Sequence, residues 1–214
     1  MYRSKLFFMA IVLITVMLFG AVGLMAQKPI VIGSPLATAF LYGWDAERGI
    51  KLAVDEINAA GGVKVGNEKR PFQVEVIDTR DLEPGVPVSE ALLAVEKLIL
   101  EKKADFLVGG PVRSEAALAA MPLLSKHKKV SILSTGALTP KYNEMIAQNP
   151  DKFKYCFRIS GEAKWMVMGE LVPCLEEIGK NFGLNKLVIM VQDVAHDRAG
   201  GDILAKVLAK KGWT

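Results

Sequence analysis

The chain has 214 residues, of which 51% are hydrophobic, and it carries 27 Lys and Arg against 23 Asp and Glu. This mixed composition excludes a disordered chain, and two cysteines are too few for a small disulfide scaffold. The length suffices for one domain with a sizeable core and for the beginning of a second. Residues 1–26 contain two basic residues and no acid, so the rest of the chain is nearly neutral and nucleic acid is not expected as a partner.

The first residues have the layout of a secretory signal peptide. The short basic start Met1–Lys5 is followed by the apolar run Leu6–Leu18 and by small residues before a polar break. This order predicts a signal peptide over residues 1–26 that is cleaved after its last residue. The alternative is an uncleaved membrane anchor over residues 6–26, which has the length of a bilayer-spanning helix. In both cases the body of the protein is expected outside the cytoplasm.

The next part of the chain alternates strand-like runs with amphipathic runs. Strands are predicted where β-branched and aromatic residues cluster or alternate, over Ile30–Gly33, Phe72–Ile77, Phe106–Val108 and Val130–Leu133. Helices are predicted where apolar residues recur every three to four positions, over Trp44–Ala60, Ser89–Lys102 and Ser114–Lys126. The alternation predicts an α/β fold, with a doubly wound parallel sheet covered by helices on both faces.

The pattern changes near residue 140. Thr139–Lys154 is polar and predicts a long connector, which is followed by a strand at Tyr155–Ser160. Residues 161–214 predict the beginning of a second α/β unit, with helix Ala163–Asn181, buried strand Lys186–Gln192 and helix Ala199–Lys211. A unit with so few strands leaves an open sheet edge, so we expect the sequence to be the first part of a longer protein.

The sequence contains no motif for nucleophilic, metal or phosphate chemistry of the GxxxxGK, GxGxxG, GxSxG or HExxH type. Cys156 and Cys174 lack a neighbouring His, so they are expected either to pair in an oxidising compartment or to be two core residues. His196 and Asp197 are adjacent, and a turn or a ligand-facing loop is the simpler interpretation than an acid–base pair. We therefore expect neither a metal nor a cofactor.

Polar and glycine-rich loops follow the predicted strands, at the edge where open α/β sheets bind ligands. Ser114 is predicted to cap the helix that follows it, and the first N–H groups of this helix would then form an anion site. Arg113 would strengthen a preference for a carboxylate, unless it pairs with Glu115 or lies in solvent.

Two further loops are candidates for the same site. Thr139 and the backbone around Gly136 can bind an ammonium or amide group of a ligand. Tyr42 and Trp44 can form an aromatic wall over it, although Trp44 is equally suited to the core at a helix start.

The sequence resembles the type I periplasmic solute-binding proteins of ABC transporters, in particular the group that binds branched-chain amino acids. The most specific motif is EINAAGGV at Glu56–Val63, at the end of an amphipathic helix. Other motifs follow in the order and spacing of the family, at Ile32–Leu36, Tyr42-Gly43, Val76–Asp78, Val108–Pro111, Ser114, Ser134–Ala137 and Phe157-Arg158. The resemblance covers essentially all of residues 29–214.

The resemblance implies a first ligand-binding lobe over residues 27–140, a hinge over 141–160 and a partial second lobe over 161–214. By position it implies ligand-binding roles for Tyr42, Arg113, Ser114, Gly136, Ala137, Thr139, His196 and Asp197. The chain departs from the family at two places. Members often carry Ala-Thr in the loop that here is Gly136–Thr139, and an aromatic residue where this chain has His196-Asp197. The ligand is therefore left open among a branched-chain amino acid, another small amino acid, an amide, and an aromatic or dicarboxylic acid.

The resemblance also implies a non-enzymatic, monomeric receptor that needs no cofactor. It would bind a small amino acid, or a related carboxylate or amide, between its lobes and deliver it to a membrane permease. One alternative is the ligand-sensing ectodomain of a signalling receptor, which a retained anchor at residues 6–26 would favour. The other is a hydrolase that uses His196 and Asp197, for which no nucleophile stands in a suitable context.

Overall fold

Five parallel strands form the central sheet of the structure, a computed structural model that describes residues 28–214. The predicted signal peptide lies outside these residues. In spatial order the strands are β4 (Phe72–Asp78), β1 (Ile30–Leu36), β5 (Phe106–Gly109), β6 (Ser131–Leu133) and β7 (Cys156–Arg158). Every neighbouring pair is parallel, which confirms the predicted parallel sheet.

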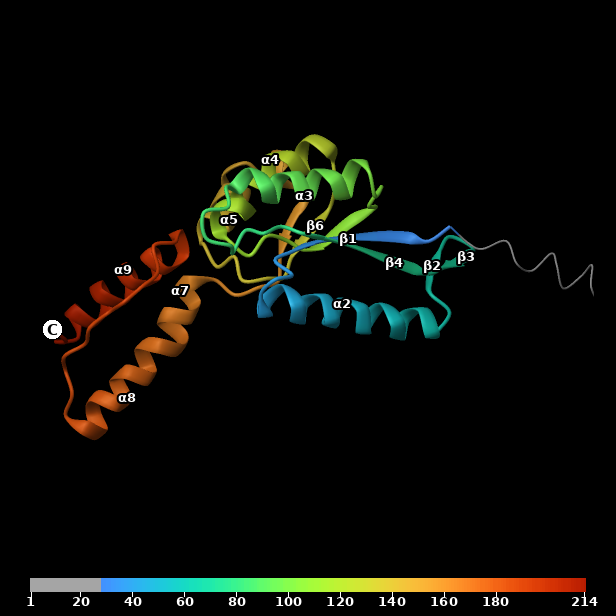
Figure 1. Cartoon of the computed structure of the whole chain (residues 1–214). Coiled ribbons are helices and arrows are strands. Elements are labelled where there is room, and N and C mark those ends of the chain that lie inside the picture. The colour runs from blue at the N-terminus through green and yellow to red at the C-terminus, as the bar shows by residue number, and fades with distance from the viewer. Residues whose placement is uncertain (1–27) are drawn as a thin grey trace, which may run out of the picture.

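Helices cover both faces of this sheet, as predicted (Figure 1). The helix α2 (Leu41–Ala59) lies on one face, and α3 (Val88–Leu100) and α4 (Ser114–His127) lie on the other. The helix α2 begins three residues before the predicted start, so Tyr42 lies on the helix and not in a loop. Within residues 28–214, no helix combines the length and the apolar character that crossing a membrane requires.

The EINAAGGV motif ends α2 and ties it to the sheet. The Asn58 side chain donates to the Phe72 carbonyl (2.9 Å) and accepts from the Phe72 N–H (2.8 Å), so it pairs with β4 as a strand would. Gly62 has a φ of +80°, and a Cβ there would lie 2.4 Å from the Arg70 carbonyl oxygen. Only glycine fits this turn without strain, which explains the motif in structural terms.

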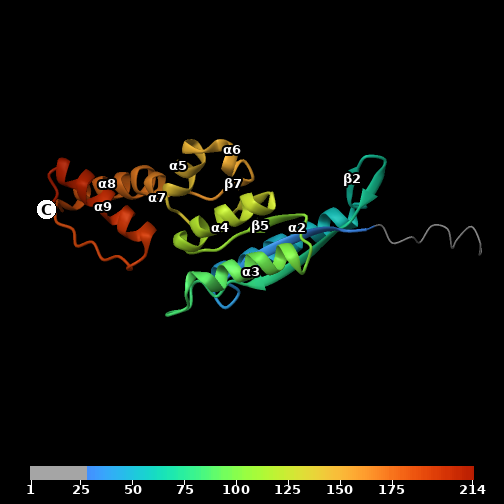
Figure 2. The ribbon, with the colours of Figure 1, turned by 90° about the horizontal axis from the view of Figure 1, so that it is seen from above.

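An unpredicted hairpin follows this turn. It is formed by β2 (Val63–Val65) and β3 (Glu68–Arg70), which pair antiparallel. Each strand has three residues and an exposed or half-buried surface, so the hydrophobic pattern gives no signal for it. The hairpin lies at the end of the molecule opposite the C-terminal helices (Figure 2).

The predicted connector Thr139–Lys154 is wrong for residues 141–153, which form α5 (Lys141–Gln148) and α6 (Pro150–Phe153) and belong to the first unit. The strand predicted at Tyr155–Ser160 is confirmed as β7, which joins the central sheet. Tyr142, Phe153 and Cys156 are nearly fully buried in the main core. The segment is polar on average, which hides these buried side chains. Pro150 begins a helix because the first turn needs no N–H from it.

The two cysteines are free, and they occupy different environments. Cys156 is buried in the core, which agrees with one of the two interpretations of the sequence. Cys174 is exposed, so the expectation of two core cysteines is wrong for Cys174. Burial raises the pKa of the Cys156 thiol to about 11, against a smaller lowering by its hydrogen bond with Tyr142.

The last part of the chain forms a second, helical unit with its own small core. A continuous helix runs through α7 (Ala163–Met166), the π-helical segment η1 (Val167–Leu171) and α8 (Val172–Phe182), and is followed by α9 (Ala195–Lys210). The π-helical segment directly precedes Pro173, whose ring cannot fit a regular helical turn. Val167, Val172, Leu204 and Leu208 are buried together, apart from the core of the first unit.

The predicted buried strand Lys186–Gln192 is wrong. The segment is extended but belongs to neither sheet, and Val188 and Met190 are 84% and 90% exposed. A strand needs a neighbouring strand, and among the described residues only Thr214 pairs with this backbone in a strand-like way. The Leu187 N–H donates to the Thr214 carbonyl (2.9 Å), and the Thr214 N–H donates to the Asn185 carbonyl (2.8 Å). These two bonds have the pattern of a parallel strand pair.

The packing of α3 makes a first prediction. Leu98 is fully buried, whereas Leu100 on the same helix is 45% exposed. We expect Leu98→Ala to lower the free energy of unfolding by about 2–5 kcal/mol, because it removes buried methyl groups and leaves a cavity. Leu100→Ala, the matched control, is expected to change it by about 0.5 kcal/mol. Urea unfolding followed by circular dichroism measures both, and equal losses would contradict this packing.

The thiols make a second prediction. At pH 8 about one in a thousand Cys156 side chains is a thiolate, the form that reacts, because its pKa lies three units higher. A thiol reagent should therefore titrate one cysteine of the folded protein rapidly and the second only after denaturation. Cys174→Ser should abolish the rapid phase, and two rapid thiols in the native protein would show that Cys156 is not buried.

Candidate ligand-binding site

The order of the strands places the candidate site beside the carboxyl ends of β1 and β5. These two neighbours lie at the centre of the sheet, and the chain leaves β1 towards α2 on one face and β5 towards α4 on the other. At such a switch point the two connecting loops diverge, and open α/β sheets bind their ligands there. The loops are residues 37–40 and residues 110–113.

Glycine is required in the loop after β5. Gly109 and Gly110 have φ angles of +107° and +94°, and a Cβ on either would lie within 2.6 Å of a leucine side chain. The Thr135 hydroxyl, itself buried, donates to the Gly110 carbonyl at 3.0 Å. The loop is thus held close to the ends of β1 and β6.

Three buried serine hydroxyls, those of Ser34, Ser114 and Ser160, have no hydrogen-bond partner among residues 28–214. Ser34 lies in β1 and Ser114 is the first residue of α4, and both are 0% exposed. The prediction that Ser114 caps α4 is wrong, because Arg113 is the N-cap residue and the Ser114 hydroxyl makes no capping bond. Since an unsatisfied buried hydroxyl is costly, Ser34 and Ser114 mark a place where a ligand can supply the missing bonds.

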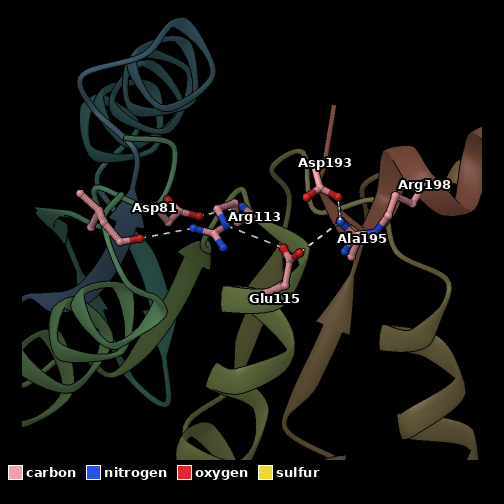
Figure 3. Close-up of polar contacts among 7 residues, drawn as sticks. Asp81, Arg113, Glu115, Asp193, Ala195 and Arg198 are labelled. Atoms are coloured by element: carbon pink, nitrogen blue, oxygen red, sulfur yellow. Dashed lines mark hydrogen bonds and ion pairs between the residues drawn. The ribbon is translucent and has the colours of Figure 1, made fainter. Parts of the chain in front are cut away.

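Arg113 is held by groups of the first unit (Figure 3). Its N–H donates to the Asp81 carboxylate (2.6 Å), and Asp81 in turn accepts from the Thr79 hydroxyl. Its guanidinium donates to the Val86 carbonyl (3.3 Å) and lies 3.8 Å from Glu115 Oε2. Arg113 therefore pairs with Glu115, which is one of the alternatives that the sequence left open.

Glu115 also joins the two units. Its Oε1 accepts a hydrogen bond from the Ala195 N–H at 3.1 Å, and Ala195 is the first residue of α9 (Figure 3). The carboxylate thus lies at the N-terminus of a helix 80 residues further along the chain. No sequence pattern indicates this contact.

The loop Gly136–Thr139 is held by an arginine that the sequence analysis gave no role. Arg158, at the end of β7, donates to the carbonyls of Ala137 and of Thr139, the latter at 3.0 Å. Burial lowers the pKa of Arg158, and Glu162 at 3.9 Å opposes this shift. The Ala137 and Thr139 carbonyls are therefore bound within the protein.

His196 and Asp197 lie in the first turn of α9, so their expected position in a loop is wrong. The two side chains face each other, and His196 Nε2 lies 3.0 Å from Asp197 Oδ1. Neighbouring side chains can converge in this way at the start of a helix. The His196 Nδ1 atom is buried and has no hydrogen bond within residues 28–214. In the same part of the chain, no three His, Cys, Asp or Glu residues are grouped as a metal site.

A largely apolar cavity of about 250 Å³ lies beside this histidine. Leu138 lines it from the first unit, and Ala163, Met166, Val167, Leu171, Ile189–Val191, His196, Asp197, Gly200, Gly201 and Leu204 line it from the second. The structure thus brings the loop that contains Gly136, Ala137 and Thr139 together with His196 and Asp197. It does not bring Tyr42 to them: Tyr42 is 67% exposed, and Trp44 stacks against Arg48 at 3.7 Å.

The comparisons with known proteins agree with this geometry. The sequence profile of periplasmic binding proteins matches residues 34–214. The chain belongs to the periplasmic binding protein family. Proteins of this family bind solutes and are not enzymes. The expected resemblance to solute-binding proteins of ABC transporters is thereby confirmed.

Solved structures of the same fold are similar over most of this chain. A Silicibacter pomeroyi protein ascribed to branched-chain amino acid ABC transport has a TM-score of 0.68 at 20% identity, over 87% of this chain and 46% of its own. A Rhodopseudomonas palustris solute-binding protein in complex with benzoate has 0.65 at 20%, over 87% and 46%. A Thermotoga maritima leucine-binding protein has 0.62 at 19%, over 86% and 46%. The chain therefore spans about half the length of these proteins.

The contacts of Arg158 make a third prediction. Arg158→Ala should lower the free energy of unfolding by about 1.5–3 kcal/mol, because it removes charged hydrogen bonds to two buried carbonyls. Arg80→Ala, which removes an exposed arginine paired only with Glu83, is expected to change it by about 0.5 kcal/mol. Urea unfolding compares the two variants, and an Arg158→Ala loss no larger than that of the control would contradict the structural role.

Proposed function

We propose that this chain is the ligand-binding part of an extracytoplasmic solute-binding protein of an ABC importer. It binds a small carboxylate, such as an amino acid or an aromatic acid, between its two units, and the complete receptor delivers this ligand to a membrane permease. The observation that carries the proposal is that the buried Ser34 and Ser114 hydroxyls, at the switch point of the sheet, have no hydrogen-bond partner among the residues that the structure describes.

The start of α4 is suited to a carboxylate. The first backbone hydrogen bond of this helix runs from the Ala117 N–H to the Arg113 carbonyl, so the N–H groups before Ala117 have no partner within the helix. These groups carry the partial positive charge of the helix end. Ser114 lies in the same turn and can donate a further hydrogen bond to an anion.

The apolar cavity is suited to the rest of such a ligand. Leu138 and the methionine, valine and leucine side chains of the second unit can bury an aliphatic side chain or a ring. The relatives point to the same class of ligand: one is named a leucine-binding protein, and others were solved with benzoate and with 3,4-dihydroxybenzoic acid.

Two cores in one chain support a receptor that closes on its ligand. The main core lies around the central sheet, and the second lies between η1, α8 and α9. We place the first lobe at residues 28–158, the hinge after Arg158 and the partial second lobe at 163–214. A ligand held by both lobes stabilises the closed form, which is the established mode of closure in periplasmic binding proteins.

The proposal also covers the location of the protein and its partners. Membership of the family favours a location outside the cytoplasm, and export by a signal peptide at residues 1–26 accounts for it. A permease partner follows from the ABC transporter relatives, and we expect a monomer.

The site makes a fourth prediction. Calorimetry of the full chain with L-leucine and with benzoate should detect binding of at least one of them. Ser114→Ala should weaken this binding by about 3–10-fold, because the ligand loses one hydrogen bond. Ser125→Ala, at the other end of α4, is the control, since its hydroxyl bonds to the Met121 carbonyl. Absence of binding to both acids, or equal affinities of the two variants, would contradict the proposed site.

A further inference from the structure

The N-terminus of α9 is already occupied by a carboxylate of the protein itself. The Ala195 N–H donates to Glu115 Oε1 at 3.1 Å. The first backbone hydrogen bond of α9 itself runs from the Arg198 N–H to the Val194 carbonyl. Glu115 comes from the other lobe and reaches across the junction (Figure 3). It thus occupies the position at which the partial charge of α9 would otherwise attract an anion.

The position of Glu115 is fixed from both sides. Its second oxygen, Oε2, is buried and lies 3.8 Å from the Arg113 guanidinium, which Asp81 and Val86 hold in place. A ligand anion that displaced Glu115 from Ala195 would leave this carboxylate without its only hydrogen bond among the described residues. The exchange would replace one carboxylate by another at the same N–H group and bring two negative charges close together, so it is unfavourable.

The charges around this point also oppose a second ligand anion. Asp197 lies in the first turn of α9, and the exposed Asp193 precedes the helix. The nearby cations are already paired: Arg113 with Glu115, and Arg198 with Asp193. At the start of α4 the Asp81 carboxylate accepts from the N-cap residue Arg113, but the Ser34 and Ser114 hydroxyls still have no partner within residues 28–214.

From this arrangement we infer that Glu115 is a specificity-determining residue that restricts the ligand to a single carboxylate. The ligand carboxylate binds at the start of α4, while Glu115 closes the start of α9 to a second one. The inference depends on the proposed function and narrows it, because it excludes the dicarboxylic acids that the sequence had left open.

The first test needs no ligand. Hydrogen exchange of the Ala195 amide should accelerate about tenfold or more in Glu115→Ala, because the N–H loses its acceptor. Glu115→Gln should keep most of the protection, since the amide oxygen can still accept. Glu90→Ala is the matched control: Glu90 also lies in the first turn of a helix of the first lobe, and it makes no hydrogen bond to the second lobe among the described residues. Unchanged exchange in Glu115→Ala would overturn the contact.

The second test compares benzoate with phthalate, which differ by one carboxylate. Calorimetry should show that the wild-type chain and Glu90→Ala bind benzoate and bind phthalate at least about tenfold more weakly. Glu115→Ala should gain about tenfold in affinity for phthalate, with its benzoate affinity within about threefold of wild type.

The outcomes separate this inference from the proposed function. Tight phthalate binding by the wild type, or no gain in Glu115→Ala, would overturn the role of Glu115 and leave a carboxylate-binding protein. Absence of binding of both acids to every variant, repeated with L-leucine and L-glutamate as a second matched pair, would overturn the proposed function and this role with it.

Discussion

Buried polar side chains at the carboxyl ends of the parallel strands hold the loops on which the candidate site depends. A loop at such an edge carries backbone groups that cannot all reach water, so each needs a partner from the protein. Asp81 holds Arg113, Thr135 holds the glycine loop after β5, and Arg158 holds the loop that ends at Thr139. Where the protein supplies no partner within residues 28–214, at Ser34 and Ser114, a ligand can supply one.

The same need for hydrogen-bond partners applies at the junction of the two lobes. At the start of α4, Asp81 accepts from the N-cap residue Arg113, and the N–H groups of residues 114–116 have no partner within the helix. At the start of α9, Glu115 accepts from the Ala195 N–H. The apolar cavity beside the start of α9 is lined by both lobes, through Leu138 on one side and residues of η1 and α9 on the other. The proposed ligand is therefore asymmetric, with one charged end and one apolar end. A carboxylate bound at one lobe and an apolar group bound at the other provide contacts that only the closed form makes together.

Much of the fold could be predicted from local patterns, and the errors have physical causes. Apart from the short hairpin of β2 and β3, the strands and helices up to residue 133 follow from alternation and from three-to-four spacing, with shifts of a few residues at their ends. Residues 141–153 were wrongly predicted as a connector because their average polarity hides Tyr142 and Phe153, which the core buries. The run Lys186–Gln192 was wrongly predicted in the opposite sense, because its apolar composition is that of a buried strand, but in the part of the chain that the structure describes only Thr214 pairs with its backbone as a strand would.

The sequence by itself determined the α/β class, the order of the elements and the glycine turns, because these depend on residues close together in the chain. It also indicated Arg113 and Ser114 beside a helix start. Only the tertiary structure decided that Ser114 is not a cap, that Arg158 occupies the carbonyls of the predicted binding loop, and that Glu115 reaches Ala195. These are contacts between segments separated by about 20 to 80 residues, and side chains so far apart are brought together by packing, which no local pattern encodes.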